Sequence, residues 1–234
     1  MHAAEHEEAL TKLLACAQAR ASELSIKANE SGVDIRLSDA QFGFEHSFIS
    51  GALPVRARQS TQALIKACSN KQRSIKTVLD LTAGWGMDSF TLAWQGQQVT
   101  LLEQNELVHA IVSYSLGRLA TDSQGAQVAA RISIEHTNAN SYLQSLDTNH
   151  DYDCIYLDPM FPRHKSSAKP AKEMQILQAL TANVEIESCF EMALQTARRR
   201  VVVKRPAKAA RLSSLKPDLV YREKTIRFDV YLTR

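Results

Sequence analysis

The sequence lacks the features that mark several classes of protein. Its four cysteines, Cys16, Cys68, Cys154 and Cys189, lie far apart, form no CxxC pair and have no histidine at a metal-ligand spacing. This pattern indicates neither a disulfide framework nor a zinc site. No segment reaches the apolar length needed to span a bilayer, and the first residues, MHAAEHEEAL, are acidic where a signal peptide would be basic. We therefore expect a cytoplasmic protein without a metal ion or a membrane partner.

The sequence also lacks internal repeats, low-complexity tracts and a strong excess of either charge. Its 234 residues carry a net charge of +3, with 23% charged and 44% hydrophobic residues. This composition is ordinary for a globular protein, and the length fits one domain with an appendage. The charge is too small to indicate nucleic acid binding by itself, so such a function has to rest on local clusters of basic residues.

The first 70 residues predict a small N-terminal α+β cap. Apolar residues at helical spacing indicate a helix over residues 5–30, and Ser31-Gly32 is a plausible end for it. Residues 33–53 alternate weakly between polar and apolar, which indicates short strands, and residues 60–69 look helical. Residues 71–234 are expected to form the main domain.

From about residue 75, short strands rich in Val, Ile and Leu alternate with helical patterns, which predicts βαβ units and a parallel sheet with both faces covered. The expected strands are 77–83, 98–104, 131–137, 153–159 and 199–206. Residues 219–225 and 226–234 are strand-like with no helix between them, so they predict a closing antiparallel pair. A mostly parallel, doubly wound sheet with an antiparallel C-terminal edge is the Rossmann-like shape of class I methyltransferases, and also of other mixed sheets.

A glycine turn follows the first of these strands. The stretch from Asp80 through Ala83, Gly84 and Gly86 lets the backbone approach a ligand closely, and Glu103 at the end of the next strand can accept both ribose hydroxyls of a nucleoside. NAD and S-adenosylmethionine (SAM) both fit this spacing. The third glycine of GxGxxG is missing, and the carboxylate of Asp80 would repel a pyrophosphate but could face the cationic methionine end of SAM, so SAM is favoured.

Asn140 and Ser141 follow the third strand, where this topology places the adenine edge of a nucleoside. A cap for the next helix explains them equally well, and the two roles are compatible.

The motif Asp158-Pro159-Met160-Phe161 ends the fourth strand, at the edge where open α/β sheets bind ligands. It resembles the (D/N)-P-P-(Y/F) motif of amino-methyltransferases. Asp158 can accept an N–H of an exocyclic amine and stabilise the positive charge that methyl transfer creates there. Pro159 fixes the backbone, and Phe161 offers a face on which a base can stack. The alternative is a structural Asp-Pro turn with Phe161 in the core.

Basic residues gather in three places: before the first strand, directly after the Asp158 motif, and on both sides of the fifth strand, from Arg198 to Arg211. Such runs are usually solvated faces, but two of them would flank the expected base pocket, which suits contacts with RNA phosphates. The residues expected to bind RNA are Arg163, Lys165, Lys169, Lys204 and Arg205.

Four stretches, "DLTAGWGMDSF", "YLDPMFPRHKSSAKPAKEM", "RRVVVKRP" and "RFDVYLTR", together resemble the ribosomal small-subunit methyltransferase J family. The resemblance implies SAM-dependent methylation of guanosine N2 in small-subunit (16S) rRNA. Carried over by position, it implies cofactor contacts at Met87, Asp88, Glu103, Gln104, Asn140, Ser141 and Asp158. Met87 and Gln104 stand where the family tends to have arginine, so less positive charge is expected near the ribose.

Other functions are compatible with the residues alone. The Asp158 motif also suits methylation of adenine N6 in DNA or RNA, or of a protein glutamine. A non-catalytic RNA-binding protein with a vestigial cofactor site is a second alternative. A nicotinamide-dependent oxidoreductase is disfavoured by the missing glycine and by Asp158-Pro159. Only the family resemblance selects guanine.

Overall fold

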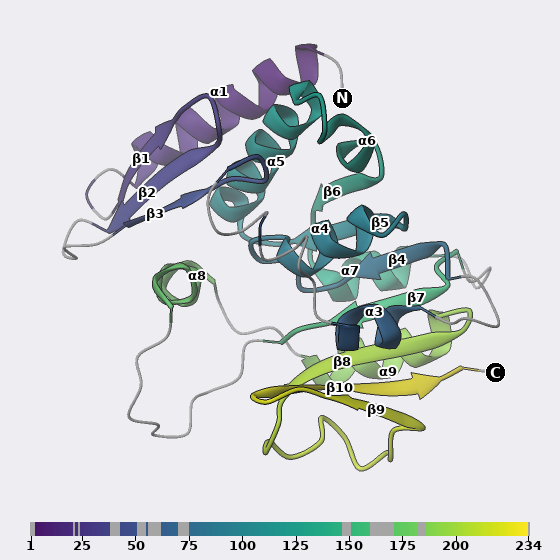
Figure 1. The fold of residues 1–234 in the computed structure, drawn as a ribbon. Helices are drawn as coiled ribbons and strands as arrows, with labels where there is room; N and C mark the ends of the chain where they lie inside the picture. Colours follow the sequence, from purple (N-terminus) through teal and green to yellow (C-terminus); the bar gives the residue numbers. More distant parts are fainter. Residues whose placement is uncertain are drawn as a thin grey trace.

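The structure is a computed structural model of the chain. It describes residues 3–20, 22, 24–37, 43–50, 55, 62–69, 75–146, 151–159, 171–181 and 186–233. Within these residues the chain forms a seven-stranded mixed sheet with helices on both faces and a separate three-stranded sheet near the N-terminus (Figure 1).

The N-terminal part consists of helix α1 (Ala3–Ala19) and the antiparallel strands β1 (Leu24–Ala28), β2 (Val33–Leu37) and β3 (Gly43–His46), in the order β1-β2-β3. Helix α1 lies along α5 (Glu106–Thr121) of the main domain (Figure 1). One continuous hydrophobic core joins the two parts, so the division near residue 70 stays a prediction.

The predicted helix over residues 5–30 is wrong beyond Ala19. Residues Leu24 to Ala28 form β1 instead, and Leu24 faces the core while Ser25 and Lys27 are exposed. The alternation of buried and exposed side chains that marks a strand extends over only five residues here. In the sequence it cannot be distinguished from the helical pattern that precedes it. Pairing with β2, from Leu24 opposite Leu37 to Ala28 opposite Val33, decides the conformation.

The main sheet has the strand order β6-β5-β4-β7-β8-β10-β9. In that order the strands are β6 (Ile132–His136), β5 (Gln98–Glu103), β4 (Thr77–Asp80), β7 (Cys154–Leu157), β8 (Arg200–Pro206), β10 (Ile226–Leu232) and β9 (Leu219–Arg222). The first five are parallel, and β10 runs antiparallel to both β8 and β9. This confirms the predicted doubly wound sheet and its antiparallel edge.

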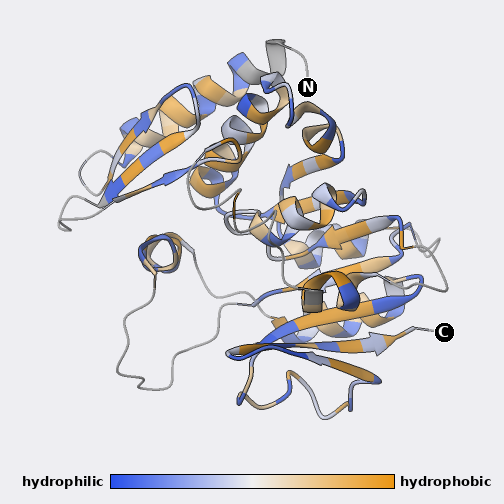
Figure 2. Cartoon of the chain, viewed as in Figure 1, coloured by the Kyte–Doolittle hydropathy of each residue, from blue (hydrophilic) through white to orange (hydrophobic). Residues whose placement is uncertain are grey.

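Helices cover both faces of this sheet. The helices are α3 (Gln62–Cys68), α4 (Met87–Trp94), α5, α6 (Ala126–Ala129), α7 (Ala139–Ser145), α8 (Lys172–Leu180) and α9 (Ile186–Thr196). Helices α3 to α6 and α8 contribute to the larger core, which also reaches the N-terminal sheet, and α7 and α9 form the core of the opposite face. The strands between the layers are hydrophobic over most of their length (Figure 2), as expected for strands buried on both faces.

The chain leaves β4 toward β5 and β6 and returns on the other side at β7. The carboxyl ends of β4 and β7 therefore form the topological switch point, where ligands of such sheets bind. Both motifs singled out in the sequence follow these two strands. In the described part of the chain, no helix combines the length and apolar character required to cross a membrane.

Candidate active site

The glycine turn after β4 adopts a conformation that only glycine accepts easily. Gly84 and Gly86 have φ values of +50° and +71°, in the left-handed region. A Cβ on Gly84 would lie 2.9 Å from Cδ2 of Leu177 in α8. Both glycines therefore serve the turn, and Gly84 also allows the close packing of α8 against it.

Glu103, the last residue of β5, holds this turn through its carboxylate. Oε2 accepts a hydrogen bond from the backbone N–H of Gly84 at 3.1 Å, and Oε1 accepts one from Asn105 at 2.7 Å. The residue is buried, and burial raises its pKa to about 7 against the opposing effect of these hydrogen bonds. A carboxylate fixed in this way keeps lone pairs with which it can accept further hydrogen bonds.

Asp80 ends β4 and is also buried. Its carboxylate accepts hydrogen bonds from the Ser89 hydroxyl at 2.6 Å and from the backbone N–H of Thr82 at 3.0 Å. Burial raises its pKa to about 7 despite these donors. Asp80 thus ties the start of the turn to α4, and its expected interaction with the methionine end of the cofactor stays a prediction.

Asp158 lies directly after β7 and shares a lysine with Asp88 in the first turn of α4. The ammonium group of Lys204, from β8, lies 2.8 Å from Oδ2 of Asp88 and 2.9 Å from Oδ2 of Asp158. The hydroxyl of Tyr156 also donates to Oδ2 of Asp88, at 2.5 Å. The backbone of Asp158 is fixed separately, because its N–H donates to Oγ1 of Thr82 at 2.7 Å.

The pKa values in this cluster follow from burial and from the shared lysine. Burial acts to lower the pKa of Lys204, but the two carboxylates outweigh it, and its pKa is raised. Asp88 receives donors from Lys204 and Tyr156, which overcome burial and lower its pKa. Burial raises the pKa of Asp158, and Lys204 offsets only part of this effect. The cluster of two carboxylates and one ammonium group carries one excess negative charge, which suits a cationic ligand.

The two basic residues of β8 that were predicted to bind RNA have intramolecular partners. Lys204 is the lysine of this cluster, and Arg205 donates to the carbonyl oxygen of Ala210 through Nε and Nη2, at 3.1 and 2.6 Å. Their RNA contacts stay predictions, and the observed partners favour roles inside the protein. The other predicted RNA contacts, Arg163, Lys165 and Lys169, lie outside the described residues, as do Met160 and Phe161.

At the expected adenine edge, the residue that caps α7 is Asn138. Its Oδ1 accepts from the backbone N–H groups of Asn140 and Ser141, and its Nδ2 donates to Oε1 of Gln104 at 2.9 Å. Oδ1 of Asn140 instead accepts from Ser188 and Cys189 of α9. Asn138 was missed in the sequence, although an asparagine directly before a helix is a recognisable capping signal.

Helix α8 returns the chain from the Asp158 loop to the glycine turn. The indole N–H of Trp85 donates to the carbonyl oxygen of Glu173 at 2.8 Å, and Nδ2 of Asn105 donates to that of Leu180 at 2.5 Å. Both ends of α8 are thus anchored at the turn and after β5. The sequence analysis did not identify this role for Trp85 or Asn105.

His46 supports the turn from the N-terminal sheet. Because the carbonyl oxygen of Trp85 only accepts, Nε2 of His46 must donate to it, at 2.9 Å, while the Ser115 hydroxyl donates to Nδ1 at 2.8 Å. Burial lowers the pKa of His46 to about 4, so the ring is neutral at physiological pH. The N-terminal part therefore takes part in positioning the turn.

The remaining predicted residues also lie in this region. Ala83 is buried in the turn and its N–H donates to the carbonyl oxygen of Leu102. Met87 begins α4 and packs against the larger core, and Pro159 is buried directly after Asp158. These positions bring Ala83, Met87 and Pro159 to the switch point.

The described residues fit SAM. The left-handed glycines give the close backbone approach, Glu103 offers acceptors at a strand end, and the Asp88–Lys204–Asp158 cluster has the excess negative charge that suits a sulfonium group. No set of three His, Cys, Asp or Glu side chains that could hold a metal ion occurs in the described part of the chain, and the expected absence of a metal stays a prediction.

Comparisons with known proteins show the family to which the chain belongs. A family model described as "Putative SAM-dependent methyltransferase" matches residues 9–233. The chain is 41% identical over 199 residues to the ribosomal RNA small subunit methyltransferase J of Thioalkalivibrio sulfidiphilus, covering 83% of this chain and 78% of that protein. It is 38% identical over 190 residues to the protein of the same name from Nitrosococcus oceani, covering 80% and 75%.

A solved structure, that of a SAM-dependent methyltransferase from Neisseria gonorrhoeae, matches with a TM-score of 0.68 and 33% identity, covering 86% of this chain and 79% of that one. The expected Rossmann-like methyltransferase fold is thereby confirmed. The chain therefore belongs to the ribosomal RNA small subunit methyltransferase J family of SAM-dependent methyltransferases, as the sequence motifs implied, and its cofactor is SAM.

Proposed function

We propose that this enzyme transfers a methyl group from SAM to the exocyclic N2 amine of a guanosine in small-subunit rRNA. The names of its relatives support an rRNA substrate, and the Asp158-Pro159 motif together with the family resemblance supports guanine N2. An rRNA substrate also supports a cytoplasmic location, which is part of the proposal, as is the absence of an obligate protein partner.

The observation that carries the proposal is the way Asp158 is held. Its N–H is fixed by Thr82 and its Oδ2 by Lys204. Oδ1 accepts no hydrogen bond from the described part of the chain, and 34% of the side chain is exposed. One oxygen is therefore anchored while the other is available to accept an N–H from a substrate amine at the carboxyl end of β7.

The amine of guanine is a weak nucleophile because its lone pair is delocalised into the ring. When bound, SAM supplies the methyl group. Asp158 accepts an amine N–H, stabilises the positive charge that develops on the nitrogen, and can take the proton that leaves it. Its raised pKa favours this last step. Lys204 keeps the two neighbouring carboxylates together without cancelling their combined charge.

Other residues position the reactants. Glu103 is proposed to accept the ribose hydroxyls of SAM, with Gln104 and Asn138 beside the adenine edge. Asp80 and Asp88 border the methionine end. Pro159 restricts the backbone after Asp158, and Phe161 is proposed to stack on the target base. Such fixed positioning contributes much of the rate in methyl transfer.

The test is methylation of small-subunit rRNA or subunits from a strain that lacks the gene, followed by identification of the modified nucleoside by mass spectrometry. We expect N2-methylguanosine. Another methylated nucleoside would refute the substrate assignment while leaving the role of Asp158 intact. If the protein binds SAM and RNA in calorimetry but forms no methylated nucleoside, the non-catalytic alternative would replace the proposal.

A further inference from the structure

A basic pocket lies beside the carboxyl end of β8, outside the active site described above. It has a volume of about 480 Å³ and is formed by the loop between β8 and β9 and by the hairpin of β9 and β10. Its lining includes Arg211, Lys216, Arg222 and Arg227, and one carboxylate, Asp229. The excess of three positive charges suits an anionic ligand.

The wall of the pocket is built by buried charged groups. Arg227 is only 6% exposed and pairs with Asp229 at 2.9 Å. Its Nη1 also donates to the carbonyl oxygens of Pro206, Ala207 and Ala209, at 3.1, 3.0 and 2.8 Å. These bonds fold the loop after β8 against the hairpin, so the shape of the pocket is fixed in the protein itself.

Arg205 adds to this wall, because its Nε and Nη2 both donate to the carbonyl oxygen of Ala210, a pocket residue. Two buried guanidinium groups, Arg205 and Arg227, lie close enough to repel each other, and Asp229 is the carboxylate that lines the pocket beside them. Burial lowers the pKa of Arg205, and repulsion from Arg227 lowers it further. An anion in the pocket would offset the repulsion between Arg205 and Arg227.

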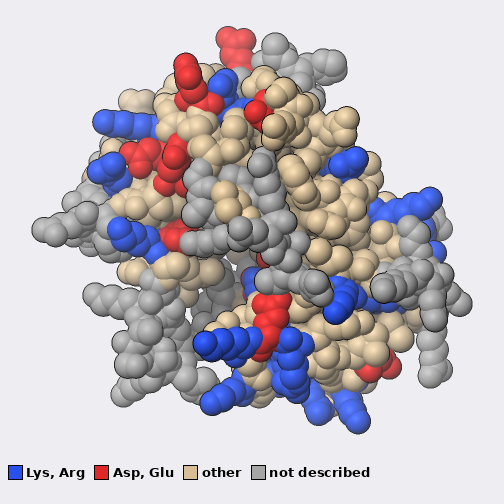
Figure 3. All heavy atoms as spheres, viewed as in Figure 1, with Lys and Arg blue, Asp and Glu red and all other residues tan. Residues whose placement is uncertain are grey.

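Arg211, Lys216 and Arg222 are exposed at the mouth of the pocket. None of the three side chains has a hydrogen bond or an ion pair with another residue in the described ranges. Figure 3 shows Lys and Arg side chains gathered on the lower part of this face, over the ends of β8 to β10 and the loop below them. These cations are available to a ligand from solution.

The pocket and the active site meet at one dipeptide. Successive side chains of a strand point to opposite faces. Lys204 reaches Asp158 on one face of β8, and Arg205 reaches the pocket wall on the other. Their α-carbons are only about 3.8 Å apart. A nucleic acid strand that places one base beside Asp158 can therefore cross the carboxyl edge of the sheet and bring its backbone to the pocket.

We propose that this pocket binds backbone phosphates of the substrate RNA next to the target nucleotide, through Arg211, Lys216 and Arg222. The inference rests on the proposed RNA substrate. Guanidinium groups bind phosphate oxygens in pairs, and a lysine adds a mobile point charge. The contacts fix the register of the RNA and carry no sequence information, so they differ in role from Asp158.

The test compares two triple variants that each remove three exposed cations. The first is Arg211→Ala, Lys216→Ala and Arg222→Ala; the control is Lys12→Ala, Lys27→Ala and Arg36→Ala in the N-terminal part. Binding to naked small-subunit rRNA is measured over a range of salt concentrations, and SAM affinity is measured as a check of folding. A charge-conserving variant, Arg211→Lys with Arg222→Lys, should keep the salt dependence.

The first variant is expected to bind RNA roughly 10- to 100-fold more weakly at 0.1 M salt, with the slope of log K against log salt reduced by about two units. SAM affinity should stay unchanged, and the control should behave like the wild type. Equal affinity and slope in the pocket variant and the wild type would overturn the proposal. The proposal would also be overturned if the pocket variant bound naked rRNA normally and only its binding to assembled subunits were weakened. That result would indicate that the pocket binds a ribosomal protein.

This test is separate from that of the proposed function, because binding does not depend on methyl transfer. Weakened binding in the pocket variant supports the phosphate site even if the wild type forms no N2-methylguanosine. Conversely, normal methylation by the pocket variant at low RNA concentration would overturn the phosphate site and leave the proposed reaction standing.

Discussion

Asp153 and Asp158 flank the same buried strand, β7, and their carboxylates meet different kinds of donor. Asp153 precedes the strand at the amino edge of the sheet, and Asp158 follows it at the carboxyl edge. The four residues of β7 separate them, so their α-carbons are five extended steps, or roughly 17 Å, apart. The side chain of Asp153 is 5% exposed and that of Asp158 is 34% exposed.

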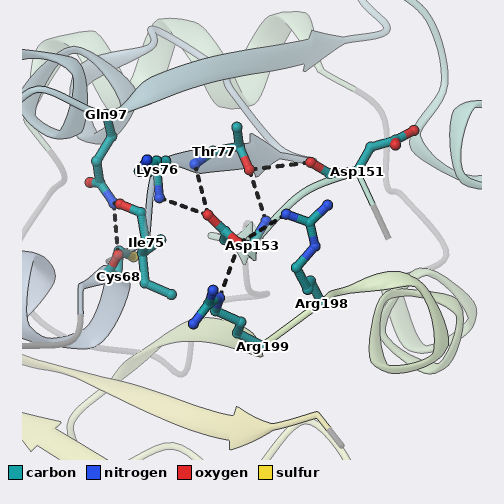
Figure 4. Close-up of polar contacts among 9 residues, drawn as sticks. All are labelled: Cys68, Ile75, Lys76, Thr77, Gln97, Asp151, Asp153, Arg198 and Arg199. Atoms are coloured by element: carbon teal, nitrogen blue, oxygen red, sulfur yellow. Dashed lines mark hydrogen bonds and ion pairs between the residues drawn. The ribbon is translucent and has the colours of Figure 1, made fainter. Parts of the chain in front are cut away.

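The carboxylate of Asp153 is surrounded by fixed donors (Figure 4). Oδ2 accepts from the backbone N–H groups of Lys76 and Thr77, at 2.8 and 3.4 Å, and Oδ1 lies 3.4 Å from Arg198 and 3.1 Å from Arg199. Burial acts to raise the pKa of Asp153, but these donors outweigh it and the pKa is lowered. Asp153 thus joins the starts of β4, β7 and β8.

Within the part of the chain that the structure describes, the carboxylate of Asp158 has one side-chain donor, Lys204, on one oxygen. Where both oxygens of a buried carboxylate are occupied by the protein, the group serves stability. Where one oxygen is held and the other is open, at the edge where ligands bind, the group is prepared for a ligand. The two ends of β7 therefore illustrate how the donors around a residue, more than its type, decide its role.

The largest expected effect is on catalysis, from Asp158→Asn. This change keeps the size and one acceptor oxygen but removes the charge that stabilises the transition state. We expect the single-turnover rate to fall about 10²–10³-fold, similar to the loss of one oxyanion-hole donor. RNA affinity and the free energy of unfolding should change little. A fully active variant would make Asp158 a structural residue like Asp153.

The same substitution at the other end of the strand, Asp153→Asn, should have the reverse effect. It places an amide N–H₂ group beside donors and leaves Arg198 and Arg199 without their carboxylate. We expect the free energy of unfolding to fall by about 1–3 kcal/mol, measured by urea denaturation. The single-turnover rate of the folded variant should stay within about twofold of the wild type, and a larger loss would contradict the division of roles.

A smaller effect is expected from Lys204→Met, which tests whether Lys204 serves the site. Without the ammonium group, the repulsion between Asp88 and Asp158 raises the pKa of Asp158 further. We expect a rate roughly 10-fold lower, with the acid limb of the pH–rate profile shifted to higher pH, and partial rescue in Lys204→Arg. An unshifted profile with weakened RNA binding would instead support the phosphate contact predicted from the sequence.

The sequence predicted the elements of the main sheet because buried parallel strands are short, apolar and bounded by helices. It also predicted the glycine turn and the position of Asp158, since both are defined by residues adjacent in the chain. The direction of Lys204 and Arg205 could not be predicted in this way. It depends on the register between β8, β7 and β10, which brings together residues that are far apart in the sequence.

The positions of the basic residues around β8 also could not be predicted from the sequence alone. The sequence analysis grouped Arg198 to Arg211 as one cluster beside the base pocket. The strand between them separates its two ends by roughly 20 Å, and Arg198 and Arg199 lie at the amino edge with Asp153. Lys204 and the residues after it lie at the carboxyl edge, beside the active site. Basic residues that flank a strand in the sequence therefore lie at opposite edges of the sheet and do not form one cluster.

Asp153 at the amino edge of the main sheet and Glu103 at its carboxyl edge should change the free energy of unfolding with pH in opposite directions. The pKa of Asp153 is lower in the folded protein, so its contribution is present above the unfolded pKa of about 4 and is lost as the pH falls. Glu103 has a folded pKa of about 7, above its unfolded value. The contribution of Glu103 to the free energy of unfolding is therefore fully present below about pH 4 and is lost as the pH rises to about 7. In urea denaturation across pH 3–8, the free energy of unfolding of the wild type minus that of Asp153→Asn should rise with pH, and the wild type minus Glu103→Gln should fall.

The final expected effect, about as large as that of Lys204→Met, is on cofactor affinity. The ribose hydroxyls of SAM are proposed to donate to the charged form of Glu103, so protons compete with SAM below the pKa of about 7. Affinity should be about tenfold weaker at pH 6 than at pH 8, measured by calorimetry, and Glu103→Gln should be weaker overall and independent of pH. Asp80 also has a pKa of about 7. If Asp80→Asn abolishes the pH dependence and Glu103→Gln retains it, the titrating group is Asp80, and Glu103 serves only to hold the turn.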